Sequence, residues 1–194
     1  NTVGKKWMRY GGTDEERLQD LQALLDDPAV NAVMFGRGGY GTMRTIDKVN
    51  WDKFRQKPKW LIGYSDITTI HLHVHSNLGI ATMHGDMSTG LSARSGNIAT
   101  KSLQDTLFGK PVAYVVKGHR HNREGNCSGV LIGGNLSIIQ ACSGSGSDID
   151  TAGKILFIED VNEYKYTIDR MLVHLKRSGK LDKLAGLIVG GFTA

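Results

Sequence analysis

Ser65 stands where a short apolar run gives way to helical spacing, within the segment 59–70. The run 60–63 predicts a buried strand, and the residues after Ser65 predict a helix. Hydrolases place a nucleophilic serine at such a turn, because the hydroxyl then projects from the edge of the sheet. The N–H of Asp66 would face a developing oxyanion at the helix start. A serine that only caps a helix is the alternative, since Ile67 replaces the second glycine of the G-x-S-x-G pattern.

A glycine-rich loop follows the apolar run 30–35 and has the sequence Gly-Arg-Gly-Gly-Tyr-Gly at 36–41. Glycines permit positive φ and close approach of the backbone to a ligand, so this loop can offer N–H donors to an anion. The spacing of Gly36, Gly38 and Gly41 also matches the dinucleotide pattern G-x-G-x-x-G. That match is formal, because the next strand ends without the acid that the pattern needs and the loop lacks a P-loop ending. A plain flexible turn stays open as a further alternative.

Several histidines could supply a base or bind a metal. His71 and His75 share one face of the expected helix, which is the spacing of a zinc pair. No glutamate occupies the position that H-E-x-x-H requires, and a zinc site needs three or four ligands, so we expect packed or surface histidines and no metal. His84 follows the apolar run 80–83 and is the candidate within this chain for a general base.

Two acids end the apolar run 155–158, namely Glu159 and Asp160, and Glu163 follows at loop distance. An acid at the carboxyl end of a strand can orient a catalytic histidine, as the third member of a triad does. The alternative is an acid near a helix N-terminus, where the helix dipole favours negative charge. Without a base to take its proton, Ser65 is a poor nucleophile.

Strands and helices alternate along the chain, which predicts an α/β fold with mostly parallel sheets. Ligands of such sheets bind at the carboxyl ends of the strands, where Gly38, Gly39, Ser65 and His84 would all emerge. We expect helices at about 14–25, 41–49, 66–78, 98–108, 136–142 and 164–177, and strands at 30–35, 60–63, 80–83, 112–116, 130–132, 155–158 and 187–192.

Two domains are expected, with a nucleophile-bearing domain at 1–111 and a smaller domain at 128–194. The polar stretch within 112–127 is the expected crossing between them. The sequence begins without Met, and its last apolar run has no following element to cover it, so we expect both domains to be truncated at the chain ends.

Composition excludes some classes of function. The chain has 194 residues, of which 40% are apolar, and this suffices for a sizeable core. The net charge is +5, but Lys and Arg are scattered and no nucleic-acid-binding pattern occurs, so we expect no nucleic-acid partner. No apolar run reaches the roughly 18 residues of a membrane span. Cys127 and Cys142 fit reduced thiols in a cytoplasmic protein.

Six motifs occur in a fixed order: Arg-Gly-Gly-Tyr-Gly at 37–41, Ile-Gly-Tyr-Ser-Asp-Ile-Thr at 62–68, His-Gly at 84–85, Gly-Gly-Asn-Leu at 133–136, Phe-Ile-Glu-Asp at 157–160 and Tyr-x-Ile-Asp-Arg-Met at 166–171. Their order and approximate spacing resemble those of the serine LD-carboxypeptidases, a family that also contains the microcin-C self-immunity proteins. The resemblance covers nearly the whole chain, from 12–17 to Gly190. It implies an N-terminal parallel-sheet (Rossmann-like) domain followed by a smaller α/β C-terminal domain.

The resemblance also implies a Ser-Glu-His triad. Ser65 matches the nucleophile and Glu159 matches the acid, with Glu163 in reserve for that role. The N–H groups of Asp66 and of Gly39, in the 38–39 pair, would form the oxyanion hole. The family's histidine comes some tens of residues after the strand that 187–192 resembles, so none of the seven histidines here matches it.

The implied activity is that of a cytoplasmic serine peptidase of peptidoglycan recycling, which removes terminal D-alanine from a murein tetrapeptide after an L-centred diamino acid. A cation should meet the substrate's terminal carboxylate, and Arg37 at the glycine loop is our candidate. The family implies a homodimer and no cofactor. One alternative is a self-immunity hydrolase of aminoacyl-adenylate mimics, and another is an inactive binding fragment.

Overall fold

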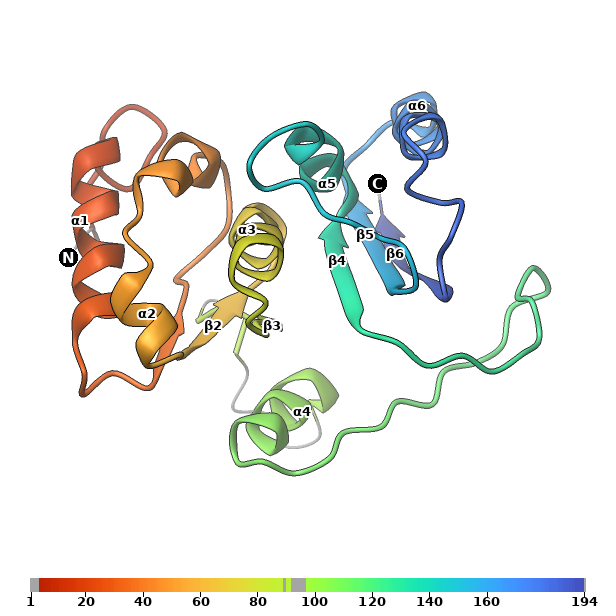
Figure 1. Ribbon diagram of the computed structural model, residues 1–194, viewed down its shortest axis with the longest axis horizontal. Coiled ribbons are helices and arrows are strands. Elements are labelled where there is room, and N and C mark those ends of the chain that lie inside the picture. The colour runs from red at the N-terminus through yellow and green to blue at the C-terminus, as the bar shows by residue number, and fades with distance from the viewer. Residues whose placement is uncertain (1–3, 89, 92–96, 194) are drawn as a thin grey trace.

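The computed structural model describes residues 4–88, 90–91 and 97–193 (Figure 1). The helices are α1 (Asp14–Asp26), α2 (Asp52–Gln56), α3 (Thr68–Leu78), α4 (Ile98–Leu107), α5 (Leu136–Cys142) and α6 (Lys165–Arg177), with short 3₁₀ turns η1 (Thr42–Arg44), η2 (Ile46–Lys48) and η3 (Ser65–Ile67). The strands are β1 (Ala32–Met34), β2 (Trp60–Gly63), β3 (Met83–His84), β4 (Leu131–Asn135), β5 (Ile155–Val161) and β6 (Gly186–Thr193).

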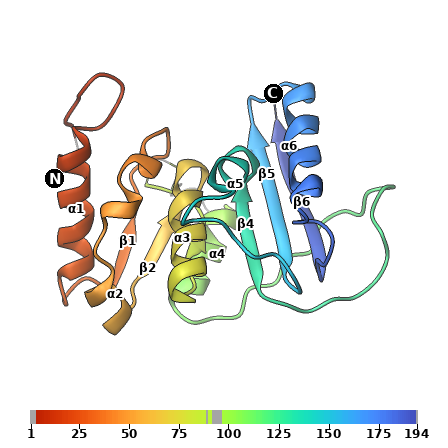
Figure 2. The ribbon, with the colours of Figure 1, turned by 45° about the horizontal axis from the view of Figure 1, so that its top comes forward.

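The strands form two parallel three-stranded sheets, in the orders β1-β2-β3 and β4-β5-β6. Figure 2 shows β1 beside β2, and β4, β5 and β6 side by side. In the first sheet the carboxyl ends of β1 and β2 lead into the glycine loop 36–41 and into Ser65. Gly63, the last residue of β2, pairs with His84, the last residue of β3. The predicted parallel α/β fold is therefore confirmed, and the expected site residues leave the first sheet at one edge.

Each sheet has its own hydrophobic core, and α3 contributes to both. Ile70 and Val74 of α3 belong to the core around β1 and β2. Leu72 belongs to the second core, which contains Leu136 of α5 and Leu156 of β5. Figure 1 accordingly shows α3 between β2 and β4. The helix that follows Ser65 thus joins the two halves of the chain.

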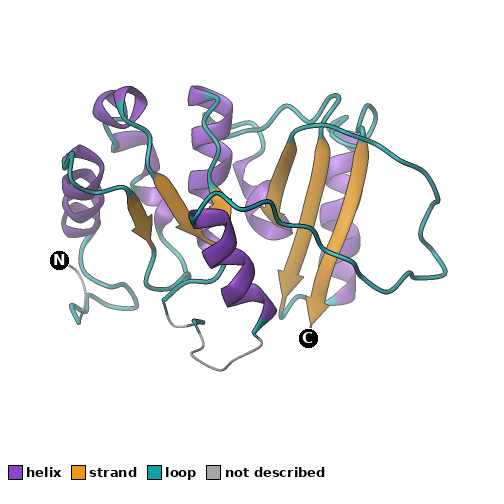
Figure 3. Ribbon diagram, turned by 90° about the horizontal axis from the view of Figure 1, so that it is seen from below, coloured by secondary structure: helices purple, strands orange, loops and turns teal. Residues whose placement is uncertain are grey.

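Strand β5 has one fully buried face and one half-buried face. Leu156, Ile158 and Asp160 are buried, and the two apolar members pack in the core formed with α5 and α6. Phe157 and Glu159 point to the opposite face, because side chains alternate along a strand. Helix α4 and residues 108–130 lie on the side of the strands opposite α5 and α6 (Figures 1 and 3).

Two predictions of secondary structure are wrong, namely the helix at 41–49 and the strand at 112–116. The helix expected at 41–49 is a pair of short turns, η1 and η2, because Thr45 leaves the helical region with φ −122° and ψ −19°. The strand expected at 112–116 is absent, and 108–130 contain neither helix nor strand. Val115 is fully exposed, so the β-forming residues of this stretch lack the partner strand that would stabilise them.

No helix in the described part of the chain combines the length and apolar character needed to cross a membrane.

Candidate active site

Ser65 lies between β2 and α3, as the sequence predicts, and its backbone is strained. Its φ of +61° is in the left-handed region, which a residue with a side chain rarely adopts. Such strain is typical of a serine at a nucleophile elbow. Gly63 is required in this turn, because a Cβ there would lie 2.9 Å from Cγ1 of Ile67. The N-cap of α3 is Ile67, so the alternative in which Ser65 only caps that helix is wrong.

The glycine loop 36–41 approaches the serine side chain closely. A Cβ on Gly38 would lie 3.0 Å from Cβ and 3.2 Å from Oγ of Ser65. Gly39 has a φ of +122° and is exposed, as is Arg37. The loop continues into the three-residue turn η1. The dinucleotide alternative therefore lacks the helix N-terminus on which a pyrophosphate would rest.

The carboxylate of Asp66 ties the elbow to the glycine loop. Its Oδ2 accepts hydrogen bonds from the N–H of Thr42 at 3.0 Å and from the Thr42 hydroxyl at 2.7 Å. Asp66 is only 5% exposed. Sequence reasoning used only the backbone N–H of Asp66 and missed its side chain, although an acid within a buried segment signals a required partner.

Both ring nitrogens of His71 form hydrogen bonds inside the first half of the chain. Its Nε2 donates to the carbonyl oxygen of Gly63 at 2.9 Å, and its Nδ1 accepts from the Thr82 hydroxyl at 2.8 Å. Burial lowers the pKa of His71 to about 4. Both ring nitrogens are thus occupied, which contradicts a zinc pair with His75. No group of three or more His, Cys, Asp or Glu side chains within the described residues could hold a metal ion.

His84 lies where the two halves of the chain meet. Its ring centroid is 5.1 Å from that of Phe157 in β5, in an edge-on arrangement, and 6.2 Å from that of Tyr64. Although the residue as a whole is exposed, burial of its ring lowers the pKa of His84. Phe157 and Glu159 share the half-buried face of β5. The end of β3 therefore meets the face of the second sheet that carries the expected acid.

Glu159 pairs in register with Asn135 of β4 and is half-buried. Burial, and secondarily the neighbouring Asp160, raises the pKa of Glu159. Its Oε1 is buried and has no hydrogen-bond partner within the described residues. Asp160, in contrast, accepts from the Asn135 side chain and from the Ser137 N–H, both at 2.9 Å. Of the two adjacent acids, Glu159 is thus the one with an oxygen available to a further donor.

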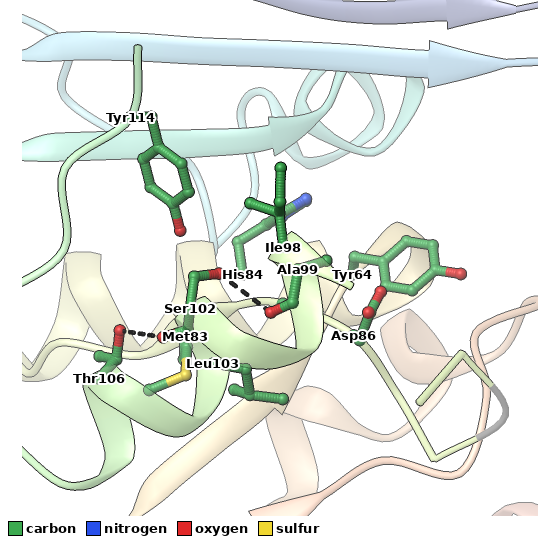
Figure 4. Close-up of a pocket in the computed structure, with 11 residues that line it drawn as sticks. Tyr64, Met83, His84, Asp86, Ile98, Ala99, Ser102, Leu103, Thr106 and Tyr114 are labelled. Carbon is green, nitrogen blue, oxygen red and sulfur yellow. Dashed lines mark hydrogen bonds between the residues drawn. The ribbon is translucent and has the colours of Figure 1, made fainter. Parts of the chain in front are cut away.

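A pocket of about 520 Å³ opens beside the elbow (Figure 4). Tyr64, which follows β2, and His84 of β3 line it on one side. Ser102 and Thr106 line it from α4, and Tyr114 lines it from the connection at 108–130. Tyr64 directly precedes Ser65, but the residues that line the pocket do not include Ser65, Gly39 or Glu159. Its aromatic rings and hydroxyl groups suit a small ligand with both polar and apolar parts.

Curated relatives match almost all of the chain. A probable murein peptide carboxypeptidase of Bacillus subtilis is 40% identical over 192 residues, covering 93% of this chain and 58% of that protein. A murein tetrapeptide carboxypeptidase of Pseudomonas aeruginosa is 32% identical over 202 residues, covering 98% of this chain and 65% of that protein. The chain thus spans about three fifths of the length of these relatives.

Solved structures agree with these relatives. A muramoyltetrapeptide carboxypeptidase from Oxalobacter formigenes superposes with a TM-score of 0.84 at 30% identity, covering 97% of this chain and 64% of that chain. The microcin C7 self immunity protein MccF, in complex with aspartyl sulfamoyl adenosine, superposes with a TM-score of 0.85 at 25% identity, covering 100% of this chain and 68% of that chain.

Two domain families account for most of the sequence. Residues 1–85 match the LD-carboxypeptidase N-terminal domain, and residues 128–194 match the LD-carboxypeptidase C-terminal domain. The elbow lies within the first match and Glu159 lies within the second. The chain therefore belongs to the LD-carboxypeptidase family of serine peptidases.

Proposed function

We propose that this protein is a serine-type LD-carboxypeptidase of murein tetrapeptides. The substrate bond joins an L-centred diamino acid to the terminal D-alanine. The names of the Bacillus subtilis and Pseudomonas aeruginosa relatives support this substrate class. The observation that carries the proposal is the elbow itself, where Ser65 has a φ of +61° and the backbone of Gly38 packs on its side chain. Strain of this kind is retained where function requires it.

In the proposed mechanism the Ser65 hydroxyl attacks the scissile carbonyl carbon, and a histidine takes its proton. Glu159 orients that imidazole. The N–H groups of Asp66 and Gly39 stabilise the oxyanion of the tetrahedral intermediate. The C–N bond then breaks, D-alanine leaves with the proton from the histidine, and water hydrolyses the acyl-enzyme. This chemistry needs no metal and no cofactor.

The histidine is proposed to come from beyond Ala194. None of the histidines in this sequence matches the family position, and the relatives are longer than the chain. The buried Oε1 of Glu159, which has no partner within the described residues, supports a role as acceptor for a further donor. Arg37, exposed at the glycine loop, is proposed to bind the terminal carboxylate of the substrate.

The domain division, location and assembly state belong to the same proposal. We propose domains at 1–111 and 128–194 joined by 112–127, which is supported by the separate core of each sheet. A cytoplasmic location fits the two free cysteines, and fractionation of cells that express the complete gene product tests it. The proposed homodimer follows family resemblance, and light scattering of the purified protein tests it.

The decisive experiment combines labelling and turnover in the complete gene product. A fluorophosphonate probe should label wild type at Ser65, and mass spectrometry should detect D-alanine released from murein tetrapeptide. Ser65→Ala should abolish both, whereas Ser178→Ala, at the end of α6, should leave both unchanged. Turnover retained in Ser65→Ala would reject the mechanism. Absence of both label and turnover in wild type would favour a non-catalytic binding protein.

A second candidate activity is hydrolysis of aminoacyl-adenylate mimics. Tyr64 and Tyr114 line the pocket, and their rings can stack on a nucleobase. The superposition with the self immunity protein in complex with aspartyl sulfamoyl adenosine supports this alternative. Calorimetric titration of the Ser65→Ala variant separates the two, because tighter binding of the nucleotide than of murein tetrapeptide favours the second activity.

A further inference from the structure

The Asp66 side chain connects the turn at Ser65 with Thr42, which lies 24 positions earlier in the sequence. Its backbone continues from Ser65, and its carboxylate reaches back to Thr42, which directly follows the glycine loop. The same loop contacts the serine through Gly38. Asp66 therefore joins the nucleophile and the loop from inside the protein, where it is only 5% exposed.

Both hydrogen bonds from Thr42 end on one oxygen of this carboxylate. Thr42 donates its N–H and its hydroxyl to Oδ2, and a carboxylate accepts such bonds more strongly than a neutral group does. The other oxygen, Oδ1, is buried and has no hydrogen-bond partner within the described residues. Burial of a carboxylate costs free energy, and the two hydrogen bonds from Thr42 offset part of that cost.

A second interaction, an ion pair, anchors the turn η1 to helix α1. Arg44, at the end of η1, pairs with Asp14 of α1 through Nη2 and Oδ2 at 2.7 Å. Its Nε donates to both oxygens of that carboxylate, at 3.0 and 2.9 Å. This ion pair anchors the turn to α1 but does not touch the elbow. It therefore offers a matched control for any general loss of loop order.

We propose that Asp66 is a positioning residue, whose carboxylate holds Thr42 so that the glycine loop keeps its N–H donors aimed at the carbonyl attacked by Ser65. This inference rests on the proposed carboxypeptidase function. It gives Asp66 two roles, because its N–H stabilises the oxyanion while its side chain fixes the segment that supplies the second donor. Small displacements of such donors are costly, since catalysis depends on their placement relative to the transition state.

Thr42 offers a sharper test than Asp66, because a change there leaves the elbow sequence intact. Thr42→Val removes the hydroxyl donor at nearly constant volume, and Thr42→Ser restores it. We expect Thr42→Val to lower kcat for murein tetrapeptide by about 10- to 100-fold with KM within about twofold of wild type. Thr42→Ser should recover kcat to within about threefold of wild type, and Asp66→Asn should lose at least as much as Thr42→Val.

Amide hydrogen exchange of the peptide that contains 36–42 provides a readout independent of turnover. Exchange should accelerate in Thr42→Val and return to the wild-type rate in Thr42→Ser. Arg44→Gln should keep kcat near wild type, because it removes only the ion pair with Asp14. If Asp66→Asn does not fold, the Thr42 pair still decides the question.

The outcomes separate this inference from the function on which it rests. Wild-type kcat in Thr42→Val, in a protein whose Ser65→Ala variant is inactive, would overturn the positioning role and leave the carboxypeptidase proposal standing. An equal loss in Arg44→Gln and Thr42→Val would also overturn it, because any loosening of the turn would then suffice. Absence of tetrapeptide turnover in wild type would reject the function and the inference together.

Discussion

The hydroxyl of Thr68 accepts the backbone N–H of Asn135 at 3.1 Å, and both residues are buried. Thr68 begins α3, three positions after Ser65, and Asn135 ends β4. Gly134 allows this approach, because a Cβ there would lie 2.6 Å from the Thr68 hydroxyl oxygen. One hydrogen bond thus attaches the nucleophile's helix to the sheet that carries Glu159.

Thr68→Val should destabilise the protein by about 1–3 kcal/mol, because the buried N–H of Asn135 would lose its acceptor. Urea unfolding of the complete gene product, followed by circular dichroism, measures the change. Thr68→Ser retains an oxygen at this position and should cost less than Thr68→Val. Wild-type stability in Thr68→Val would mean that this hydrogen bond does not contribute to stability.

Gly38→Ala should lower kcat by about tenfold or more, because the added methyl group meets the Ser65 side chain and displaces the loop or the nucleophile. Gly36→Ala is the matched control, since the nearest atom to its Cβ is Oγ of Ser88 at 3.9 Å. Neither glycine has a positive φ, so alanine adds no backbone strain at either position and the two variants differ only in what the methyl group meets. Steady-state hydrolysis of murein tetrapeptide measures both variants, and equal rates would contradict the close approach of the loop to Ser65.

Glu159→Gln should reduce kcat by about 10³-fold or more while KM changes little, as expected for an acid that orients a catalytic histidine. Glu163→Gln should leave kcat close to wild type. Both variants are compared in the tetrapeptide assay, with thermal unfolding as a check on folding. A large loss only in Glu163→Gln would transfer the role of acid to Glu163, the reserve candidate.

His71 should make the protein sensitive to acid. Its pKa is lowered by burial from 6.5 to about 4, so between these values the unfolded state binds a proton that the folded state does not. Stability is therefore complete above about pH 6.5, and up to roughly 3 kcal/mol is lost as the pH falls to about 4. Urea unfolding across this range should show a smaller acid-induced loss in His71→Gln than in wild type. His119→Gln, in the exposed connection, should behave as wild type.

Local patterns were sufficient to predict the elements that position the candidate site. The apolar run at 60–63 corresponds to β2, and the helix expected at 136–142 is α5 with the same bounds. The helix expected at 164–177 is α6, which begins one residue later. Hydrophobic periodicity and glycine position carry this information, because they reflect burial along a single element.

Contacts between distant segments were not predictable in this way. Asp66 meets Thr42 across 24 positions, and Thr68 meets Asn135 across 67. The first contact depends on how η1 packs against the turn at Ser65, and the second depends on how β4 packs against α3. No local pattern encodes either arrangement. The catalytic roles of Ser65 and Glu159 stay predictions for the same reason, since a triad is defined by relative placement of three groups.

The exposed connection at 108–130 has a consequence for limited proteolysis. Exposed chain without helix or strand is where proteases cut most readily. After such a cut, helix α3 would still bind the C-terminal part of the chain, because its side chains form hydrogen bonds with the segment 146–148. The three residues are His73, Ser76 and Asn77. A nicked molecule should therefore elute from a sizing column as one particle and separate into two fragments only in denaturant, which makes this connection a natural place to divide the protein into complementing halves.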